Sequence, residues 1–181
     1  MFQMDFHNLV VSNLGPGGAI ELLNAGHQRF KGYELQLSLT PEAIEGLTLR
    51  WGYAHHDARF VEFTFVTPDS QLRNVAGKRL ELVPQDLWNA SMSYRSHCGA
   101  GLWAAVREQG ARALTRRNTF FTPSFTEWDA GLSYERGPMR VAVTGRNLGD
   151  DRHPVSESEI GDSQFYLSAP RRVMGEVTVR F

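Results

Sequence analysis

The sequence has one cysteine, no surplus of charge and no long apolar run. The single thiol, at Cys98, excludes an internal disulfide, and no CxxC motif or Cys/His cluster beside it makes a zinc site. Lys and Arg number 19 against 20 Asp and Glu, which leaves no basic excess to attract nucleic acid. No run approaches the roughly 18 apolar residues that span a bilayer as a helix. A disulfide-stapled domain, a nucleic-acid-binding protein and a helical membrane protein are therefore excluded.

The composition is that of a chain that folds. Apolar residues make up 41% of the 181 residues and aromatic residues 11%, which argues against disorder. Residues 1–13 have no basic region, no continuous apolar region and no small-residue cleavage site, so we expect no export signal in them.

Apolar residues recur at every second position in segment after segment, which predicts strands rather than helices. Six strong segments have this pattern, and two weaker ones, Phe2–Val11 and Leu102–Arg107, bring the expected number of strands to eight. The predicted apolar faces are Tyr33, Leu35, Leu37 and Leu39; Leu47, Leu49, Trp51 and Tyr53; Trp88, Ala90, Met92 and Tyr94; Trp128, Ala130, Leu132 and Tyr134; Val141 and Val143; and Val173, Val177, Val179 and Phe181.

The connections between these strands alternate between short and long. Short turns are expected over residues 41–46, 96–99 and 136–138, and long loops over residues 13–29, 61–79, 111–124 and 149–171. All long loops then lie at one end of the sheet. Transmembrane barrels sort their loops in this way, with short periplasmic turns and long external loops.

Two further features fit a transmembrane barrel. Moving a strand by one residue would turn a charged side chain toward lipid, at a cost of roughly 2 to 4 kcal/mol for a basic residue near the midplane. Aromatic residues are expected on the apolar face at the periplasmic rim, as an interfacial girdle. The charged side chains are Arg50, Asp129, Arg140 and Glu176, and the rim aromatics are Phe2, Tyr94, Tyr134 and Phe181.

Several short stretches occur in an order and spacing that resemble one family. They are Asn24-Ala25-Gly26, Lys31-Gly32-Tyr33-Glu34-Leu35, Gly46-Leu47-Thr48-Leu49, Gly77-Lys78-Arg79 with Pro84, Thr144-Gly145-Arg146-Asn147-Leu148-Gly149-Asp150, and Pro170-Arg171-Arg172-Val173 before a terminal Phe181. Over nearly its whole length, residues 1–181, the chain resembles the carboxy-terminal part of the β-barrel of TonB-dependent outer-membrane receptors.

The resemblance implies an all-β fold, an antiparallel meander of about eight transmembrane strands within a 22-stranded barrel. Eight strands are about a third of such a barrel, so the segment alone is expected to be open. The plug domain, the TonB-contacting segment and the signal peptide of the family are not in this sequence, and we expect a receptor fragment. Its location would be the outer membrane of a Gram-negative bacterium.

The same resemblance implies a transporter and not an enzyme. The family takes up scarce metal chelates, most often ferric siderophores, with energy transmitted by the TonB complex to the amino-terminal part. Outer-membrane lipid and lipopolysaccharide would surround the wall. The terminal Phe181 resembles the signal that the barrel assembly machinery recognises.

Candidate ligand-binding residues lie in the expected external loops. His27 and His153 stand where a ferric chelate would first touch the protein, and Arg116 and Arg117, like Arg171-Arg172, could attract an anionic siderophore. For each of them, simple solvation or contact with lipopolysaccharide phosphates is the competing interpretation.

No motif indicates a catalytic centre, a resident metal or a cofactor. His55, His56 and Asp57 are adjacent on a strand and point to opposite faces, so they cannot easily share one ion. Gly15-Pro16-Gly17-Gly18 is not followed by the Lys-Ser/Thr of a phosphate-binding loop.

Two alternatives stay open from the sequence. Eight strands are also the smallest number that closes a membrane barrel, so a free-standing structural or adhesive barrel is one. A soluble β-sandwich binding module, with the apolar faces turned inward, is the other.

Overall fold

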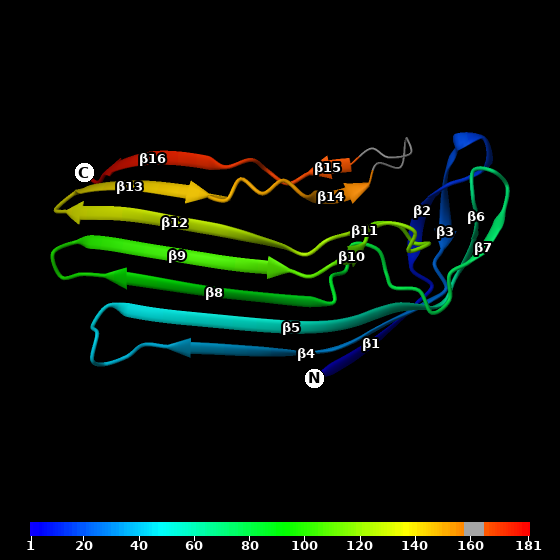
Figure 1. Ribbon diagram of the computed structural model, residues 1–181, viewed down its shortest axis with the longest axis horizontal. Coiled ribbons are helices and arrows are strands. Elements are labelled where there is room, and N and C mark those ends of the chain that lie inside the picture. The colour runs from blue at the N-terminus through cyan, green and yellow to red at the C-terminus, as the bar shows by residue number, and fades with distance from the viewer. Residues whose placement is uncertain (158–164) are drawn as a thin grey trace.

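The computed structural model describes residues 1–157 and 165–181 and consists of one large antiparallel sheet (Figure 1). Eight strands follow one another in the sheet in chain order, which confirms the predicted meander. They are β1 (Phe2–His7), β4 (His27–Leu39), β5 (Leu47–Glu62), β8 (Asp86–Arg95), β9 (Ala100–Gln109), β12 (Phe125–Arg136), β13 (Met139–Arg146) and β16 (Arg172–Val179).

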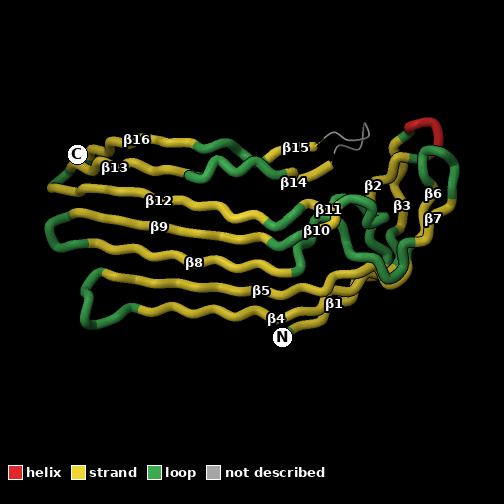
Figure 2. The backbone as a smooth tube through the Cα atoms, viewed as in Figure 1, coloured by secondary structure: helices red, strands yellow, loops and turns green. Residues whose placement is uncertain are grey.

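The short turns and the long loops lie at opposite ends of this sheet, as the sequence predicts (Figure 2). Each long loop contains a two-stranded hairpin that the apolar alternation does not predict. The hairpins are β2 (Val10–Leu14) with β3 (Ile20–Asn24), β6 (Thr64–Val66) with β7 (Leu72–Asn74), β10 (Arg112–Ala113) with β11 (Phe121–Thr122), and β14 (Pro154–Glu157) with β15 (Phe165–Leu167); a short 3-10 turn, η1 (Pro16–Gly18), joins the first pair. The predicted loop over residues 149–171 includes 158–164, which lie outside the described residues.

The pairing register places apolar side chains on one face of the sheet through seven strands. Leu37 lies opposite Trp51, and Trp51 lies opposite Ala90. On the other face Arg50 lies opposite Ser91. Directly opposed residues of antiparallel strands share a face, so the predicted alternation is confirmed. We call these the apolar face and the polar face.

The apolar face is exposed. Leu35 retains 53% and Leu132 62% of its accessible surface, and no second layer of the described chain covers them. This single sheet contradicts a β-sandwich, in which those side chains would be sealed between two layers.

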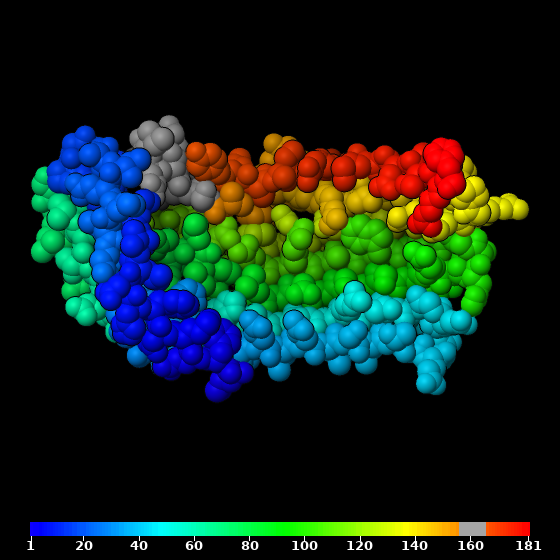
Figure 3. Space-filling view, turned by 180° about the vertical axis from the view of Figure 1, so that it is seen from behind, coloured from blue at the N-terminus to red at the C-terminus, as the bar shows by residue number. Residues whose placement is uncertain are grey.

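The two edges of the sheet are separate. β1 is at one border and β16 at the other, and among the described residues each pairs with one neighbour only (Figure 3). The closed eight-stranded barrel is therefore not formed, and the sheet is open as expected. None of the described helical segments is long and apolar enough to cross a bilayer.

The prediction for Phe2 was wrong. Phe2 pairs with Gly32, midway along β4, and its ring lies 6.0 Å from that of His56, on the polar side of the sheet. It is thus neither at the short-turn end nor on the apolar face. The strand also ends at His7 rather than Val11, because Asn8 adopts a left-handed conformation (φ 58°) and the chain turns into the first hairpin.

Other strands are longer than predicted, most of all toward the long loops. β4 begins at His27 rather than Gly32, β5 continues to Glu62, and β9 covers Ala100–Gln109 rather than Leu102–Arg107.

From Gly32 toward the long loops, the apolar face becomes polar and the polar face becomes apolar. In this part of β4 and β5, the face that carries Tyr33 continues with Lys31 and Arg29, whereas the opposite face carries Phe30. The latter packs against a compact cluster beneath the long loops, formed by Ala25, Ala58, Phe60, Phe63, Phe65, Val75 and Leu80 with Val11, Leu23, Phe30 and Val83 at its border. This cluster is the buried core of the described chain, and it secures the first two hairpins to the sheet.

Candidate functional site

A cavity of about 1010 Å³ lies on the polar face, between the central strands and the loop end. β8, β9, β12 and β13 form its floor, and the segment around His153 and residues 167–169 forms its border. In a closed barrel this face would line the lumen.

An ionic network covers the floor of this cavity. The Asp129 carboxylate, 4% exposed, accepts hydrogen bonds from Arg107 at 3.0 Å, from Arg146 at 2.9 Å and from the Asn147 backbone N–H at 2.9 Å. Arg107 also donates to Glu127 at 2.9 Å. The register explains the network, since Glu127 opposes Arg107 across the β9/β12 pair and every member is on the polar face.

A glycine and a tryptophan position the Arg146 guanidinium. The guanidinium carbon lies 5.1 Å from the centre of the Trp103 ring, within cation–π range. Trp103 opposes Gly131, and a Cβ atom at that position would clash with the Trp103 indole nitrogen. Gly131 therefore makes room for the ring on which the arginine rests.

Arg112, in β10, has the most unusual environment in the cavity. Its side chain is 7% exposed, and its Nη2 donates to the Val155 carbonyl at 3.0 Å. Its Nε–H is buried and has no hydrogen-bond partner among the described residues. Burial lowers the pKa of Arg112, although an arginine keeps its charge at neutral pH. The cavity lining thus contains a buried cation with one donor that no described residue engages, and such a cation attracts an anionic oxygen.

His153 also borders the cavity. It is buried and stacks on Phe125, and its backbone N–H donates to Ser168 Oγ at 3.2 Å. Burial lowers the pKa of the His153 imidazole below its ordinary 6.5, so the ring is neutral at pH 7.

The cavity lining contains three arginines, Arg107, Arg112 and Arg146, and three acidic residues, of which Glu127 and Asp129 are on the polar face. The third, Glu108, is on the apolar face, where its carboxylate accepts a hydrogen bond from Trp88, so the polar face has one more guanidinium group than carboxylates. His153 is neutral and adds no charge. The arrangement can therefore bind an anion by charge-assisted hydrogen bonds, with Phe125 as an adjacent flat apolar surface.

Of the four predicted ligand-binding residues, only His153 lines the cavity on the polar face, and the others lie elsewhere. His27 is not in a loop as predicted but is the first residue of β4, where it contacts Asp5 at 2.7 Å and stacks on His7. Arg116 donates to Glu81 and to the Ser12 carbonyl, both at 2.8 Å, and so ties three loops together.

Arg117 and the other polar pairs are also located. Arg117 is exposed, and its carbonyl accepts a hydrogen bond from Lys78. The Arg171 backbone N–H donates to Asp150, which lowers the pKa of that carboxyl. His55 contacts Asp86 at 2.8 Å, whereas His56 lies 3.8 Å from Glu34, so these two histidines have different partners as their opposite orientations require.

Sequence reasoning missed Arg107, Arg112 and Arg146. Arg146 alternates with apolar residues in a predicted strand, and that pattern assigned it only to the polar side. Arg107 ends a segment, Leu102–Arg107, that was predicted only as a weak strand, so no face was assigned to it. Arg112 lies in a two-residue strand within a predicted loop, where no period exists to be detected. Its role depends on chain packing that brings Val155, 43 residues away, beside it.

The sequence matches the family model for the TonB dependent receptor-like β-barrel over residues 1–148. The chain belongs to the TonB-dependent receptor family. No curated protein matches it.

Solved structures of TonB-dependent receptors have the same fold as this segment. The siderophore receptor PiuA from Acinetobacter baumannii superposes with a TM-score of 0.75 at 16% identity, over 98% of this chain and 25% of PiuA. The ferric-catecholate import receptor Fiu from E. coli K12 gives 0.68 at 20% identity, over 99% and 24%. The ferric preacinetobactin receptor BauA from A. baumannii gives 0.68 at 18% identity, over 98% and 26%. This TonB-dependent receptor segment therefore spans about a quarter of the length of the solved receptors.

Proposed function

We propose that this segment is part of the barrel wall of a receptor that imports a metal chelate, most specifically a ferric siderophore, across the outer membrane of a Gram-negative bacterium. The observation that carries the proposal is the cavity on the polar face, where the buried Arg112 offers an unused donor. The solved receptors with this fold are receptors for ferric siderophores by their descriptions, which supports the same class of cargo.

The residues fit an anionic chelate chemically. Siderophores bind Fe³⁺ through catecholate, hydroxamate or carboxylate oxygens, and many of the complexes keep a net negative charge. Arg112 would donate to such an oxygen, and Arg107 and Arg146 would add positive potential along the wall. Phe125 would pack against the apolar backbone of the ligand. His153, Arg116, Arg117 and His27 are further candidates nearer the outside.

In this proposal the segment binds and guides the cargo and performs no covalent chemistry, so it is not an enzyme. Energy would come from the TonB complex, through a plug domain that residues 1–181 do not contain. The apolar face would contact outer-membrane lipid and lipopolysaccharide. The barrel assembly machinery would recognise Phe181.

Iron uptake tests the transport function. The protein is expressed from its complete reading frame in a strain without other siderophore receptors, and ⁵⁵Fe-loaded catecholate, hydroxamate and α-hydroxycarboxylate siderophores are supplied in turn. We expect TonB-dependent uptake of one class, and a loss of about tenfold or more in Arg112→Gln, since a hydrogen bond to a charged group contributes roughly 1.5 to 3 kcal/mol. Arg95→Gln, at the short-turn end, is the matched control. Absence of uptake for every class, or equal uptake by Arg112→Gln and wild type, would contradict the proposal.

The assembly role of Phe181 is tested separately. Phe181→Ala should lower the amount of protein in the outer-membrane fraction without changing its synthesis, whereas Arg180→Ala should not. Equal amounts of all three proteins in that fraction would remove the assembly role and leave the transport proposal intact.

A further inference from the structure

His153 and Arg112 line the same cavity on the polar face, and both side chains are buried. Arg112 belongs to β10, and His153 lies directly before β14. The imidazole stacks on Phe125 of β12, which fixes the plane of the ring. A ring that can gain a proton and a permanent cation are thus held in one cavity.

Ser168 determines which nitrogen of the neutral ring carries the hydrogen. Its Oγ donates its single hydrogen to the Asp151 carbonyl at 3.0 Å and accepts from the His153 backbone N–H at 3.2 Å. The ring Nδ1 lies 3.4 Å from the same Oγ, so Nδ1–H must be the donor in that contact. Nε2 has no hydrogen-bond partner among the described residues. It is therefore the atom that takes up a second proton.

Charged groups from several elements act on this ring. Burial lowers the pKa of His153, the carboxylates of Asp151 and Glu127 raise it, and the positive charge of Arg112 lowers it. Arg112 has no carboxylate partner among the described residues, so no counter-ion weakens its effect on the ring. The remaining charged groups of the polar face are paired with one another, Arg107 with Glu127 and Asp129, and Arg146 with Asp129.

We propose that an anion bound at Arg112 draws a proton onto Nε2 of His153, so that cargo binding and protonation of this ring are coupled. The anion cancels the positive charge that opposes the imidazolium, and the imidazolium adds a positive charge near the anion. The proton comes from the surrounding solution and returns to it when the cargo leaves. This coupling rests on the proposed function, in which Arg112 receives an anionic oxygen, and it adds a regulation of that site.

The coupling has a definite direction with pH. Because the complex binds one more proton than the free protein, the affinity for the anion rises as the pH falls. One proton allows a rise of about tenfold per pH unit at most. Binding is reciprocal, so the anion must raise the pKa of His153 by the same free energy. The cavity thus holds an anionic cargo more tightly in an acidic medium.

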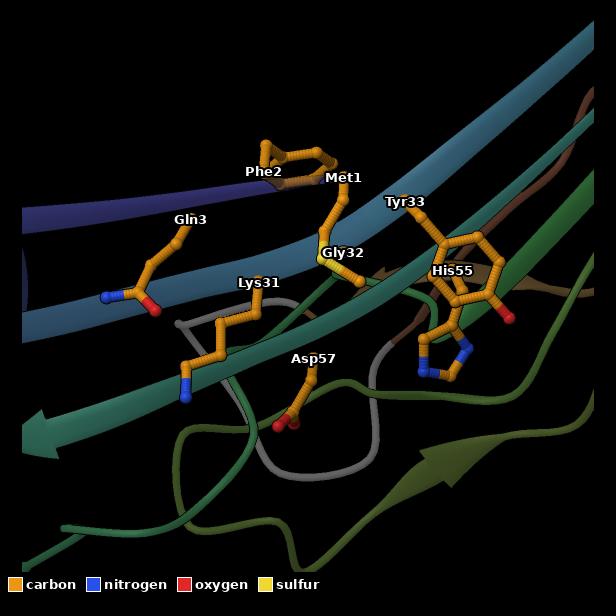
Figure 4. Close-up of a pocket in the computed structure, with 8 residues that line it drawn as sticks. All are labelled: Met1, Phe2, Gln3, Lys31, Gly32, Tyr33, His55 and Asp57. Carbon is orange, nitrogen blue, oxygen red and sulfur yellow. The ribbon is translucent and has the colours of Figure 1, made fainter.

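A second hollow, of about 550 Å³, lies at the start of β1 beside β4 and β5 and provides a contrast (Figure 4). His55 borders it, and its Nδ1 is 2.8 Å from the Asp86 carboxylate. Lys31, the cation of this hollow, lies beside Asp57 in Figure 4. The histidine and the cation each have a carboxylate next to them already. Lys31→Gln therefore removes one positive charge beside a cavity without touching the proposed pair.

The first measurement is the titration of His153 with and without sulfate, an oxyanion that keeps its charge throughout the pH range used. The protein is expressed from its complete reading frame, labelled at histidine and studied by NMR in micelles, with chloride at the same ionic strength as the blank. His153→Gln assigns the resonance. Sulfate should raise the pKa of His153 in wild type and in Lys31→Gln, but not in Arg112→Gln.

The second measurement is the affinity for sulfate, determined by calorimetry from pH 7.5 to pH 4.5. The affinity of wild type and Lys31→Gln should rise about fivefold or more over this range, at the lower end of the coupling usual between two sites. The affinity of His153→Gln should stay nearly constant. The same titration of His153 with and without sulfate, or a pH dependence that persists in His153→Gln, would overturn the proposal. Failure of wild type to bind sulfate at any of these pH values would overturn it as well.

The iron-uptake assay keeps the two proposals apart. Uptake that depends on Arg112, together with a titration of His153 that ignores sulfate, fails only this inference. Absence of uptake for every siderophore class, with the sulfate effect on His153 intact, fails only the proposed function.

Discussion

The Trp88 indole Nε1 donates a hydrogen bond of 2.8 Å to the Glu108 carboxylate across β8 and β9. One strand further along, the Tyr53 hydroxyl donates to Asp86 at 2.7 Å. Both rings lie on the apolar face at its end toward the long loops, and the polar group of each donates to a carboxylate. Aromatic side chains with one apolar part and one hydrogen-bonding group are typical of a membrane–water interface. In the proposed outer-membrane location, hydrocarbon would end near the level of these two rings.

Tyrosines mark the other end of the apolar face, at the short turns, on β8 and β12. Tyr94 lies six residues after Trp88, and Tyr134 lies six residues after Trp128, about 20 Å along each strand at ~3.3 Å per residue. On β4 and β5, toward the long loops, the face of Tyr33 and Tyr53 continues with Lys31, Arg29 and Arg59, and the other face packs on the buried cluster, whereas on β8 and β9 the same outward face carries Asp86 and Glu108. In the proposed membrane location, the bilayer would end where β4 and β5 change from apolar to charged outward residues.

Asp129→Asn should destabilise the barrel. The change removes the charge that two guanidinium groups share on the cavity floor, and because those arginines are about half exposed we expect a loss of about 2 kcal/mol rather than the larger cost of a fully buried pair. Urea unfolding in micelles measures it. Glu45→Gln, which breaks the exposed pair with His97, should change stability by less than about 0.5 kcal/mol. Equal effects of the two variants would show that the network is not structural.

Gly131→Ala should destabilise by about 1 to 3 kcal/mol, because the new methyl group meets the Trp103 indole. In the Trp103→Ala background most of this cost should disappear, and the Val143 carbonyl, 3.1 Å from the new Cβ atom, accounts for what remains. A double-mutant cycle measures the coupling. Gly175→Ala is the control, because a Cβ atom there meets nothing within 4 Å. A cost that persists without Trp103 would place the strain elsewhere in the strand.

The His153 ring should stay neutral at pH values where an exposed histidine has gained a proton. Its folded pKa lies below its unfolded value, so the unfolded chain binds the extra proton first and stability falls as the pH decreases from about 6.5 toward the folded pKa. Histidine-labelled NMR in micelles checks the titration of His153. Protonation of His153 at or above pH 6.5 would contradict its burial.

Strand number, order and register could be predicted from the sequence because hydrocarbon imposes one simple rule, apolar out at every second residue. Leu35 and Arg50 illustrate it: each could point only one way. The same rule failed for Phe2. Its strand, β1, pairs with the part of β4 in which the polar face becomes apolar, so the Phe2 ring lies on that face beside His56. His27 was assigned to a loop for the same reason. The first residues of β4 carry polar side chains on the outward face, so no apolar alternation indicates that the strand begins there.

The candidate site was the least predictable part. In the sequence, Trp103 is one alternating residue among many, and only the strand pairing shows that it lies opposite Gly131. Arg112 is buried only because the chain around Val155 packs beside it. Such contacts join positions tens of residues apart, and no local pattern encodes them.

The central claim is that lipid, and not protein, covers the apolar face. Trp51 is on that face and Trp103 is on the polar face, so the pair tests the claim within one protein. Single-tryptophan variants, reconstituted from the complete reading frame into bilayers with brominated acyl chains, should show strong fluorescence quenching at Trp51 and little at Trp103. Equal quenching at both positions, or quenching at Trp103 alone, would contradict the account.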